Sequence, residues 1–309
     1  MKNKIISMLL SLTVIFGTAL FPFDNLAYAE KKPKPIDYLD YNMLQEPPEG
    51  MHHYLMACVD NWHGNANNLG NTDGVIMVTM DTVNKRILFT SFLREMLVER
   101  PQGGAGRITY IAKNHGIETF VKIISEHFGV KLENYIIFDM DAVQTIIDAM
   151  GGVYITVTDD EADYLNRYRI SRDSTTPSMD KGGTYLFSGH AAVIYMRIRK
   201  VGGDGDMGRN RRMRTVLVTL TGQLKNISFE KALSILQVVT GNNLVTNMSM
   251  PKMLSAVQQA LSLREVTPEN IQMPPSEAIT PINYAGMMTQ EVDFAYARKV
   301  LNDFIYKVK

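Results

Sequence analysis

The residues of this 309-residue chain with the clearest chemical potential are arginines and aspartates in two separate segments. One segment holds Asp73 and Arg94, and the other, richer segment lies between residues 197 and 214. The planar arginine fork binds phosphate oxygens in pairs and stays charged. Aspartates beside a phosphate repel it unless a hard cation such as Mg²⁺ bridges the two. The combination therefore predicts a metal-assisted site for a polyphosphate group.

The first pair is predicted to meet at the open end of a β-hairpin. Two β-rich runs, 74–80 and 86–92, are joined by a turn at 82–85. In an antiparallel hairpin the residue numbers of each pair add up to the same value. For a turn at 82–85 this rule places Asp73 opposite Arg94. An ordinary cross-strand salt bridge at a sheet end is the alternative interpretation of this pair.

The second segment is predicted to begin a long helix. From Asp206, one helical stripe passes through Arg209 and then through four apolar residues, Met213, Leu217, Leu220 and Leu224. Asp206 and Arg209 should therefore point inward, whereas Arg211 and Arg214 should face solvent and Arg212 should lie at the flank. Buried charge is costly unless it is paired or ligated, so the stripe favours a site over a solvated basic helix face.

The elements around these segments predict one α/β domain over residues 50–309. Further strands are expected at 54–59, 135–138 and 153–157, with a weak one near 281–288. Residues 159–181 are mixed and polar, and we expect an exposed excursion there. Helices are expected at 117–128, 142–150, 189–196, 206–224, 230–239, 251–263 and 290–306.

The N-terminal segment predicts export. Lys2 and Lys4 precede an apolar stretch over 5–21, and Ala27-Tyr28-Ala29 matches a signal-peptidase site, so 1–29 is expected to be a signal peptide. An uncleaved membrane anchor is the alternative. Both place the remainder outside the cytoplasm, either secreted or on the outer face of the membrane. Residues 30–49 are expected to form a flexible leader.

Composition excludes several classes of protein. Lys+Arg and Asp+Glu both total 32, and this balance argues against a nucleic-acid binder. The one cysteine, Cys58, excludes an internal disulfide and a cysteine zinc site, and its apolar setting predicts a buried, inert thiol. P-loop and H-E-x-x-H motifs are absent from the sequence.

Taken together, these segments resemble the LytR-CpsA-Psr family of cell-wall glycopolymer ligases. The resemblance covers nearly all of residues 50–309. It rests on Asn-Thr-Asp at 71–73, Ser-Phe-Leu-Arg-Glu at 91–95, FDMDAVQTIIDAMGG at 138–152, Tyr-x-Arg-x-Arg-Lys at 195–200 and Asp-x-Gly-Arg-x-x-Arg at 206–212.

The resemblance implies a single extracytoplasmic α/β/α domain with a mixed central sheet and a hydrophobic tunnel for a polyprenyl chain. The implied reaction is a Mg²⁺-assisted phosphotransfer that moves a glycosyl phosphate from a polyprenyl pyrophosphate carrier to peptidoglycan, at the membrane surface. By the same resemblance Asp73 would hold Mg²⁺, and Asp206 would orient arginines or assist the acceptor hydroxyl. The expected substrate-binding residues are Arg94, Arg197, Arg199, Arg209 and Arg212.

Four positions depart from the family pattern. Asn71 replaces a usual arginine, Glu95 an aspartate, Met213 a glutamine and Ile198 a frequent histidine. These departures keep open a non-catalytic binder of polyprenyl-linked envelope intermediates. A pyrophosphate hydrolase is a further alternative, and the export signal argues against a transcriptional attenuator.

Overall fold

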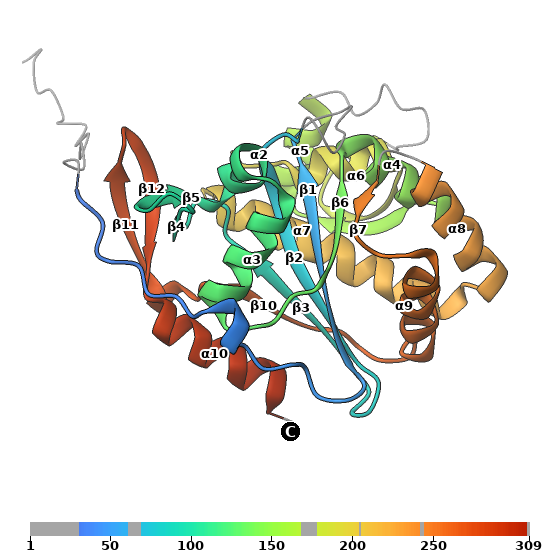
Figure 1. Ribbon diagram of the computed structural model, residues 1–309. Coiled ribbons are helices and arrows are strands. Elements are labelled where there is room, and N and C mark those ends of the chain that lie inside the picture. The colour runs from blue at the N-terminus through green and yellow to red at the C-terminus, as the bar shows by residue number, and fades with distance from the viewer. Residues whose placement is uncertain (1–30, 61–68, 168–177, 204, 242–243, 308–309) are drawn as a thin grey trace, which may run out of the picture.

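A six-stranded mixed sheet forms the centre of the computed structural model, which describes residues 31–60, 69–167, 178–203, 205–241 and 244–307. The predicted signal peptide lies outside these residues. The strand order is β10-β3-β2-β1-β6-β9, in which β6 runs parallel to β1 and β10 parallel to β3 (Figure 1). The strands are β1 (Met51–Val59), β2 (Thr72–Asp81), β3 (Arg86–Phe92), β6 (Asn134–Phe138), β9 (Val245–Thr246) and β10 (Glu269–Met273).

Helices cover both faces of this sheet, because alternate strand residues point to opposite sides. Val75 and Met77 of β2 enter one core, which α3 (Ile117–Phe128) and α10 (Phe294–Tyr306) close. Ile76 and Met80 enter the other core, against α7 (Gly205–Gln223), α8 (Phe229–Gly241) and α9 (Met250–Ser262). The predicted α/β/α architecture with a mixed sheet is confirmed. The helices in the described part of the chain are all too short or too polar to cross a bilayer.

A third core lies beside the sheet. It joins α4 (Met140–Ala149), α5 (Asp159–Arg167) and α6 (Gly189–Met196) to a hairpin of β7 (Val153–Val157) and β8 (Gly183–Phe187). The prediction of an exposed excursion was wrong for α5, because Ala162 and Leu165 are buried in this core. Three hydrophobic residues in nine gave too little periodic signal to reveal the helix.

Two smaller hairpins extend the domain on the side of α2 (Ile111–His115) and α3 (Figure 1). One pairs β4 (Leu97–Glu99) with β5 (Ala105–Arg107), and the other pairs β11 (Ile279–Tyr284) with β12 (Met287–Val292). The sequence predicted only a weak strand near β11 and did not reveal β4 or β5. Strands of three residues carry no readable alternation.

The segment expected to be a flexible leader, described from residue 31 onward, makes several contacts with the domain. The Lys34 backbone N–H donates to Glu291 Oε1 at 2.6 Å. The Tyr38 ring stacks on His127 with 5.6 Å between the ring centroids, and Asp37 pairs with Arg298 of α10. These contacts tie the chain before β1 to the face covered by α3 and α10.

His127 of α3 makes the stability of the fold depend on pH. Its Nδ1 lies 2.7 Å from the Ile123 carbonyl oxygen, and its Nε2 accepts from the Glu99 backbone N–H at 3.0 Å, so the buried ring is neutral. Burial lowers the His127 pKa to about 4, and burial also lowers the pKa of His53 to about 4. Because the folded pKa is below the unfolded value, this stabilisation is complete above about pH 6.5 and is lost as the pH falls toward 4.

Between pH 6.5 and 4 the unfolding free energy should fall because His127 and His53 must both take up a proton on unfolding. We expect His127→Gln to reduce this fall by about half, because only the contribution of His53 then remains. Urea unfolding across this pH range measures the slope. The matched control is His115→Gln, because His115 is partly exposed and its side-chain hydrogen bond in the described structure is to the exposed Gln102. A slope that His127→Gln leaves unchanged would contradict the assignment.

Candidate active site

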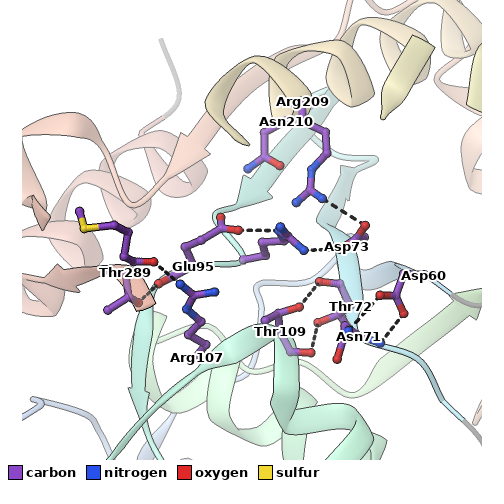
Figure 2. A network of polar contacts seen from close by, with 12 residues as sticks. Asp60, Asn71, Thr72, Asp73, Glu95, Arg107, Thr109, Arg209, Asn210 and Thr289 are labelled. Carbon is purple, nitrogen blue, oxygen red and sulfur yellow. Dashed lines mark hydrogen bonds and ion pairs between the residues drawn. The ribbon is translucent and has the colours of Figure 1, made fainter. Parts of the chain in front are cut away.

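Asp73 lies at the centre of a network of cations at one end of the sheet. Its Oδ1 is 2.5 Å from Arg94 Nη1, and its Oδ2 is 3.2 Å from Arg209 Nη1 (Figure 2). The β2–β3 register runs from Ile76↔Ser91 to Asp81↔Arg86, and each pair has the same sum as positions 73 and 94. The predicted hairpin-end contact is confirmed.

Helix α7 brings Arg209 to this aspartate. The Arg209 side chain is only 2% exposed, as its place on the apolar stripe predicted, and Met213 and Leu217 below it pack into the core. Asn210 holds the helix against the end of β3, because its Nδ2 donates to the Phe92 carbonyl at 3.2 Å. Asp206 belongs to the first turn of α7, but its side chain lies outside the described part of the structure.

A polar pocket of about 300 Å³ opens beside this network. Among the residues that the structure describes, its lining consists of Asp60, Asp73, Arg94, Arg197, Arg199 and Arg209. All four of these arginines were predicted from sequence as substrate-binding residues, and the structure brings them together. Four arginines and two aspartates leave a formal excess of two positive charges, which suits a dianionic group.

Asp60 is a member of the pocket that the sequence analysis missed. It follows β1 directly and accepts from Asn71, whose backbone N–H is 2.7 Å from Oδ1 and whose side-chain amide is 2.9 Å from Oδ2. Asn71, at the position where the family usually has arginine, therefore binds this aspartate at the edge of the pocket. A charged residue directly after a buried strand is the sequence signal that was available.

Glu95 and a pair of threonines fix the loop that carries Arg94. The Glu95 carboxylate lies 2.5 Å from Arg94 Nε, and its backbone carbonyl accepts from the Gln290 N–H at 3.1 Å. On the other side of Asp73, Thr109 and Thr72 exchange two side-chain to carbonyl hydrogen bonds, of 3.0 and 3.3 Å (Figure 2). Both flanks of the central ion pair are thereby tied to neighbouring elements.

Arg212 does not reach the pocket, although the sequence placed it in the substrate-binding set. Its side chain is 1% exposed, and its Nε lies 2.7 Å from Glu161 Oε1 on α5. Its other nitrogens donate to the carbonyls of Ile198 at 3.1 Å and Val201 at 3.4 Å. Arg212 thus contacts the loop in which Arg197 and Arg199 flank Ile198, and this contact can position the two arginines.

The prediction that Arg214 faces solvent was wrong. Arg214 is partly buried, and its Nη1 donates to Ser91 Oγ of β3 and to Gln272 Oε1 of β10. Burial lowers the pKa of this guanidinium. Arg211, by contrast, is exposed as predicted. The apolar stripe in the sequence predicted which face of α7 is buried. It did not predict that the neighbouring face, which carries Arg214, packs against β3 and β10.

An apolar cavity of about 150 Å³ adjoins the polar pocket and shares Asp73, Arg197 and Arg209 with it. Its other walls are almost entirely aliphatic, aromatic and thioether groups from β1, β2, β6, α4, α6 and α7. A Cβ at Gly74 would lie 2.5 Å from the Met213 sulfur, so a larger residue at position 74 would require the Met213 side chain to move. Together the two spaces offer a cationic end and an apolar end, as an amphipathic anion requires.

Cys58 also lines the apolar cavity, between the sheet and α4. Burial, reinforced by the nearby carboxylates of Asp73 and Asp139, raises the pKa of its thiol to about 12. The thiol is therefore un-ionised at neutral pH, as expected for an inert cysteine.

The chain belongs to the LytR_cpsA_psr family, whose model matches residues 28–302. It is 27% identical over 208 residues to biofilm regulatory protein A of Streptococcus mutans, a match that covers 63% of this chain and 50% of that protein. It is also 27% identical over 221 residues to the polyisoprenyl-teichoic acid–peptidoglycan teichoic acid transferase TagU of Oceanobacillus iheyensis, over 69% of this chain and 64% of that protein. The match thus spans less than two thirds of the length of either relative.

The fold is shared with a solved structure of Bacillus subtilis TagV. The TM-score is 0.65 at 20% sequence identity, over 85% of this chain and all (100%) of that chain. This likeness supports the architecture of the domain, and the polar pocket and apolar cavity described above supply the evidence on chemistry.

Proposed function

We propose that this protein is an extracytoplasmic phosphotransferase that moves a glycosyl phosphate polymer from a polyprenyl pyrophosphate carrier to peptidoglycan in cell-wall biogenesis. The observation that carries the proposal is the arginine-lined pocket that adjoins an apolar cavity and shares three residues with it. The relative TagU, which is named a polyisoprenyl-teichoic acid–peptidoglycan teichoic acid transferase, supports this class of substrate.

The charge of the pocket matches the proposed donor. A pyrophosphate esterified at both ends carries two negative charges, equal to the formal excess of the pocket lining. Asp73 holds Arg94 and Arg209 in place before the donor binds. Such preorganised cations stabilise charge in the transition state at little reorganisation cost.

In the proposed reaction, an acceptor hydroxyl oxygen attacks the phosphorus that carries the sugar. A new P–O bond forms to the acceptor, and the bond from that phosphorus to the bridging oxygen breaks. Polyprenyl phosphate leaves with the bridging oxygen, and the hydroxyl proton passes to a base, a role for which Asp206 is the candidate. Arg197, Arg199 and Arg209 would neutralise the charge on the phosphate oxygens, because phosphoryl transfer depends mainly on positioning and electrostatics.

Mg²⁺ fits the carboxylates of this pocket. Proteins usually bind Mg²⁺ through one or two carboxylates together with substrate phosphates, and Asp73 and Asp60 are the carboxylates lining the described pocket. Each Asp73 oxygen meets one arginine and keeps a lone pair for a cation. When bound, Mg²⁺ would neutralise phosphate charge and so favour departure of the leaving group.

We expect chelation of divalent cations by EDTA to lower the rate of transfer by at least about a hundredfold, because the electrostatic stabilisation of the leaving phosphate is lost. Restoring excess Mg²⁺ should recover the rate, as measured by release of polyprenyl phosphate. A rate that EDTA leaves unchanged would exclude the metal from the proposal. Thermal unfolding in EDTA serves as the control for a loss of fold.

The apolar cavity is proposed to receive the first part of the polyprenyl chain. At about 150 Å³ it holds only a short apolar segment, so a longer chain requires its wall to move. Four methionines of the wall, Met56, Met140, Met196 and Met213, have the flexible, unbranched side chains that permit such repacking.

The test of the function is a transfer assay with a polyprenyl pyrophosphate-linked saccharide, Mg²⁺ and soluble peptidoglycan fragments. We expect release of polyprenyl phosphate and labelled peptidoglycan, both dependent on the acceptor. Release that does not require peptidoglycan would indicate the hydrolase alternative. Donor binding without turnover with any acceptor would instead support the non-catalytic binder.

A further inference from the structure

A second cleft, of about 230 Å³ and with a lining more apolar than polar, lies between the β4–β5 hairpin, α2 and the turn of the β11–β12 hairpin. Its lining includes two tyrosines and several hydrogen-bond donors, and no Asp or Glu is among the described residues that form it. The polar and aromatic members are Arg100, Arg107, Tyr110, Asn114, His115 and Tyr284.

The two arginines of this cleft donate to backbone carbonyls. Arg107 Nη2 donates to the Met288 carbonyl, and its buried Nε–H meets no acceptor within the described parts of the chain. Arg100 donates to the carbonyls of Gly103 and Gly104, both at 3.3 Å. Neither guanidinium pairs with a carboxylate in the described ranges. Arg107 is partly buried, and a partly buried guanidinium without a carboxylate favours an anion from outside the protein; the exposed Arg100 adds a second cation to the same cleft.

The cleft is adjacent to the polar pocket through a short, rigid connection. Thr109 lies between Arg107 and Tyr110 in the chain, and it exchanges two hydrogen bonds with Thr72, the residue before Asp73. Figure 2 shows Thr109 beside Thr72 and Asp73, and Arg107 beside Glu95 and Thr289. Through Thr72 and Thr109, the wall of the cleft is thus connected to the end of β2 that carries Asp73.

We propose that this cleft is a subsite for an anionic saccharide unit of the polymeric substrate, next to the reacting phosphate. The inference rests on the proposed function for the identity of the polymer. The tyrosines supply apolar area with polar tips for a sugar ring, and the arginines supply forked donors for its phosphate or carboxylate. Binding energy from such a remote unit is used to orient the reacting group.

The test is calorimetric titration of the whole chain with three soluble probes. These are an oligo(glycerol phosphate) with phosphodiesters, a peptidoglycan fragment with carboxylates, and a neutral chitin oligomer. At least one anionic probe should bind, and Arg100→Gln and Arg107→Gln should each weaken its binding about tenfold. Arg264→Gln is the matched control, because Arg264 is half-exposed at the end of α9 and pairs with its neighbour Glu265.

Preference for the phosphodiester would assign the cleft to the donor polymer, and preference for the carboxylate would assign it to the acceptor. Equal binding of the neutral probe, or unchanged binding by both cleft variants, would overturn the subsite. The transfer assay is scored separately. If transfer occurs but the two cleft variants bind the probes normally, only the subsite proposal fails. If the variants weaken probe binding but no transfer occurs, only the proposed reaction fails.

Discussion

Replacing Asp73 by asparagine is expected to lower the rate of transfer about a thousandfold, the loss found when a preorganised electrostatic group is removed from an active site. Asparagine keeps the shape of the side chain but removes the charge that both Arg94 and Arg209 contact. Arg209 is 2% exposed, so water cannot replace the lost partner. The same substitution removes the main proposed ligand for Mg²⁺. Steady-state kinetics with the polyprenyl-linked donor measures the effect.

Asp303→Asn is the control for this variant. Asp303 also lies between two cations, with Lys299 at 3.0 Å and Lys307 at 3.1 Å, but all three are on the exposed end of α10. The control should leave transfer unchanged. A folded Asp73→Asn protein that retains more than about a tenth of the parent rate would contradict a central role for this carboxylate.

Removal of the Glu161 side chain is expected to have the largest effect on stability. Glu161→Ala removes the carboxylate that lies 2.7 Å from the buried Arg212 Nε, and breaking a buried pair in this way costs about 3–5 kcal/mol of unfolding free energy. Because Arg212 also holds the carbonyls of Ile198 and Val201, the loop bearing Arg197 should loosen. We therefore expect KM for the donor to rise in Glu161→Ala, measured at temperatures below the unfolding transition of this variant.

The matched control comes from the same helix. Asp163→Ala removes an exposed carboxylate whose partner, Arg167, lies 3.6 Å away with a largely exposed side chain, so the change should stay below about 1 kcal/mol. Urea unfolding compares the two. The double variant Glu161→Ala/Arg212→Met should regain part of the lost stability, since it no longer buries the guanidinium that lost the Glu161 carboxylate. If Glu161→Ala costs no more than Asp163→Ala, the buried pair does not have the role assigned to it.

Much of the candidate site was predictable from the sequence because it depends on short-range periodicity. A hairpin has a constant pairing sum, and this sum alone is enough to place Asp73 against Arg94. A helix repeats every 3.6 residues, and this repeat turns Arg209 inward with Met213. Both inferences concern residues within about twenty positions of one another, for which local geometry suffices.

The features that the sequence missed depend on distant partners. Arg212 finds Glu161, 51 residues earlier, on a helix whose sequence is typical of an exposed excursion. Arg214 meets Gln272 on β10, which pairs with β3 only through the tertiary fold. Asp60 became a pocket residue because the end of β1 lies beside the start of β2. No periodic pattern encodes these contacts.

The most direct measurement is a crystal structure of the protein with geranyl pyrophosphate and Mg²⁺. We expect the pyrophosphate to bind among Arg94, Arg197, Arg199 and Arg209, with the prenyl chain in the apolar cavity that Gly74 and Met213 line. Gly74→Leu, which fills the entrance to that cavity, should abolish binding of the prenyl chain while inorganic pyrophosphate still binds. Pyrophosphate bound elsewhere, or a prenyl chain lying outside an unchanged cavity, would contradict the account.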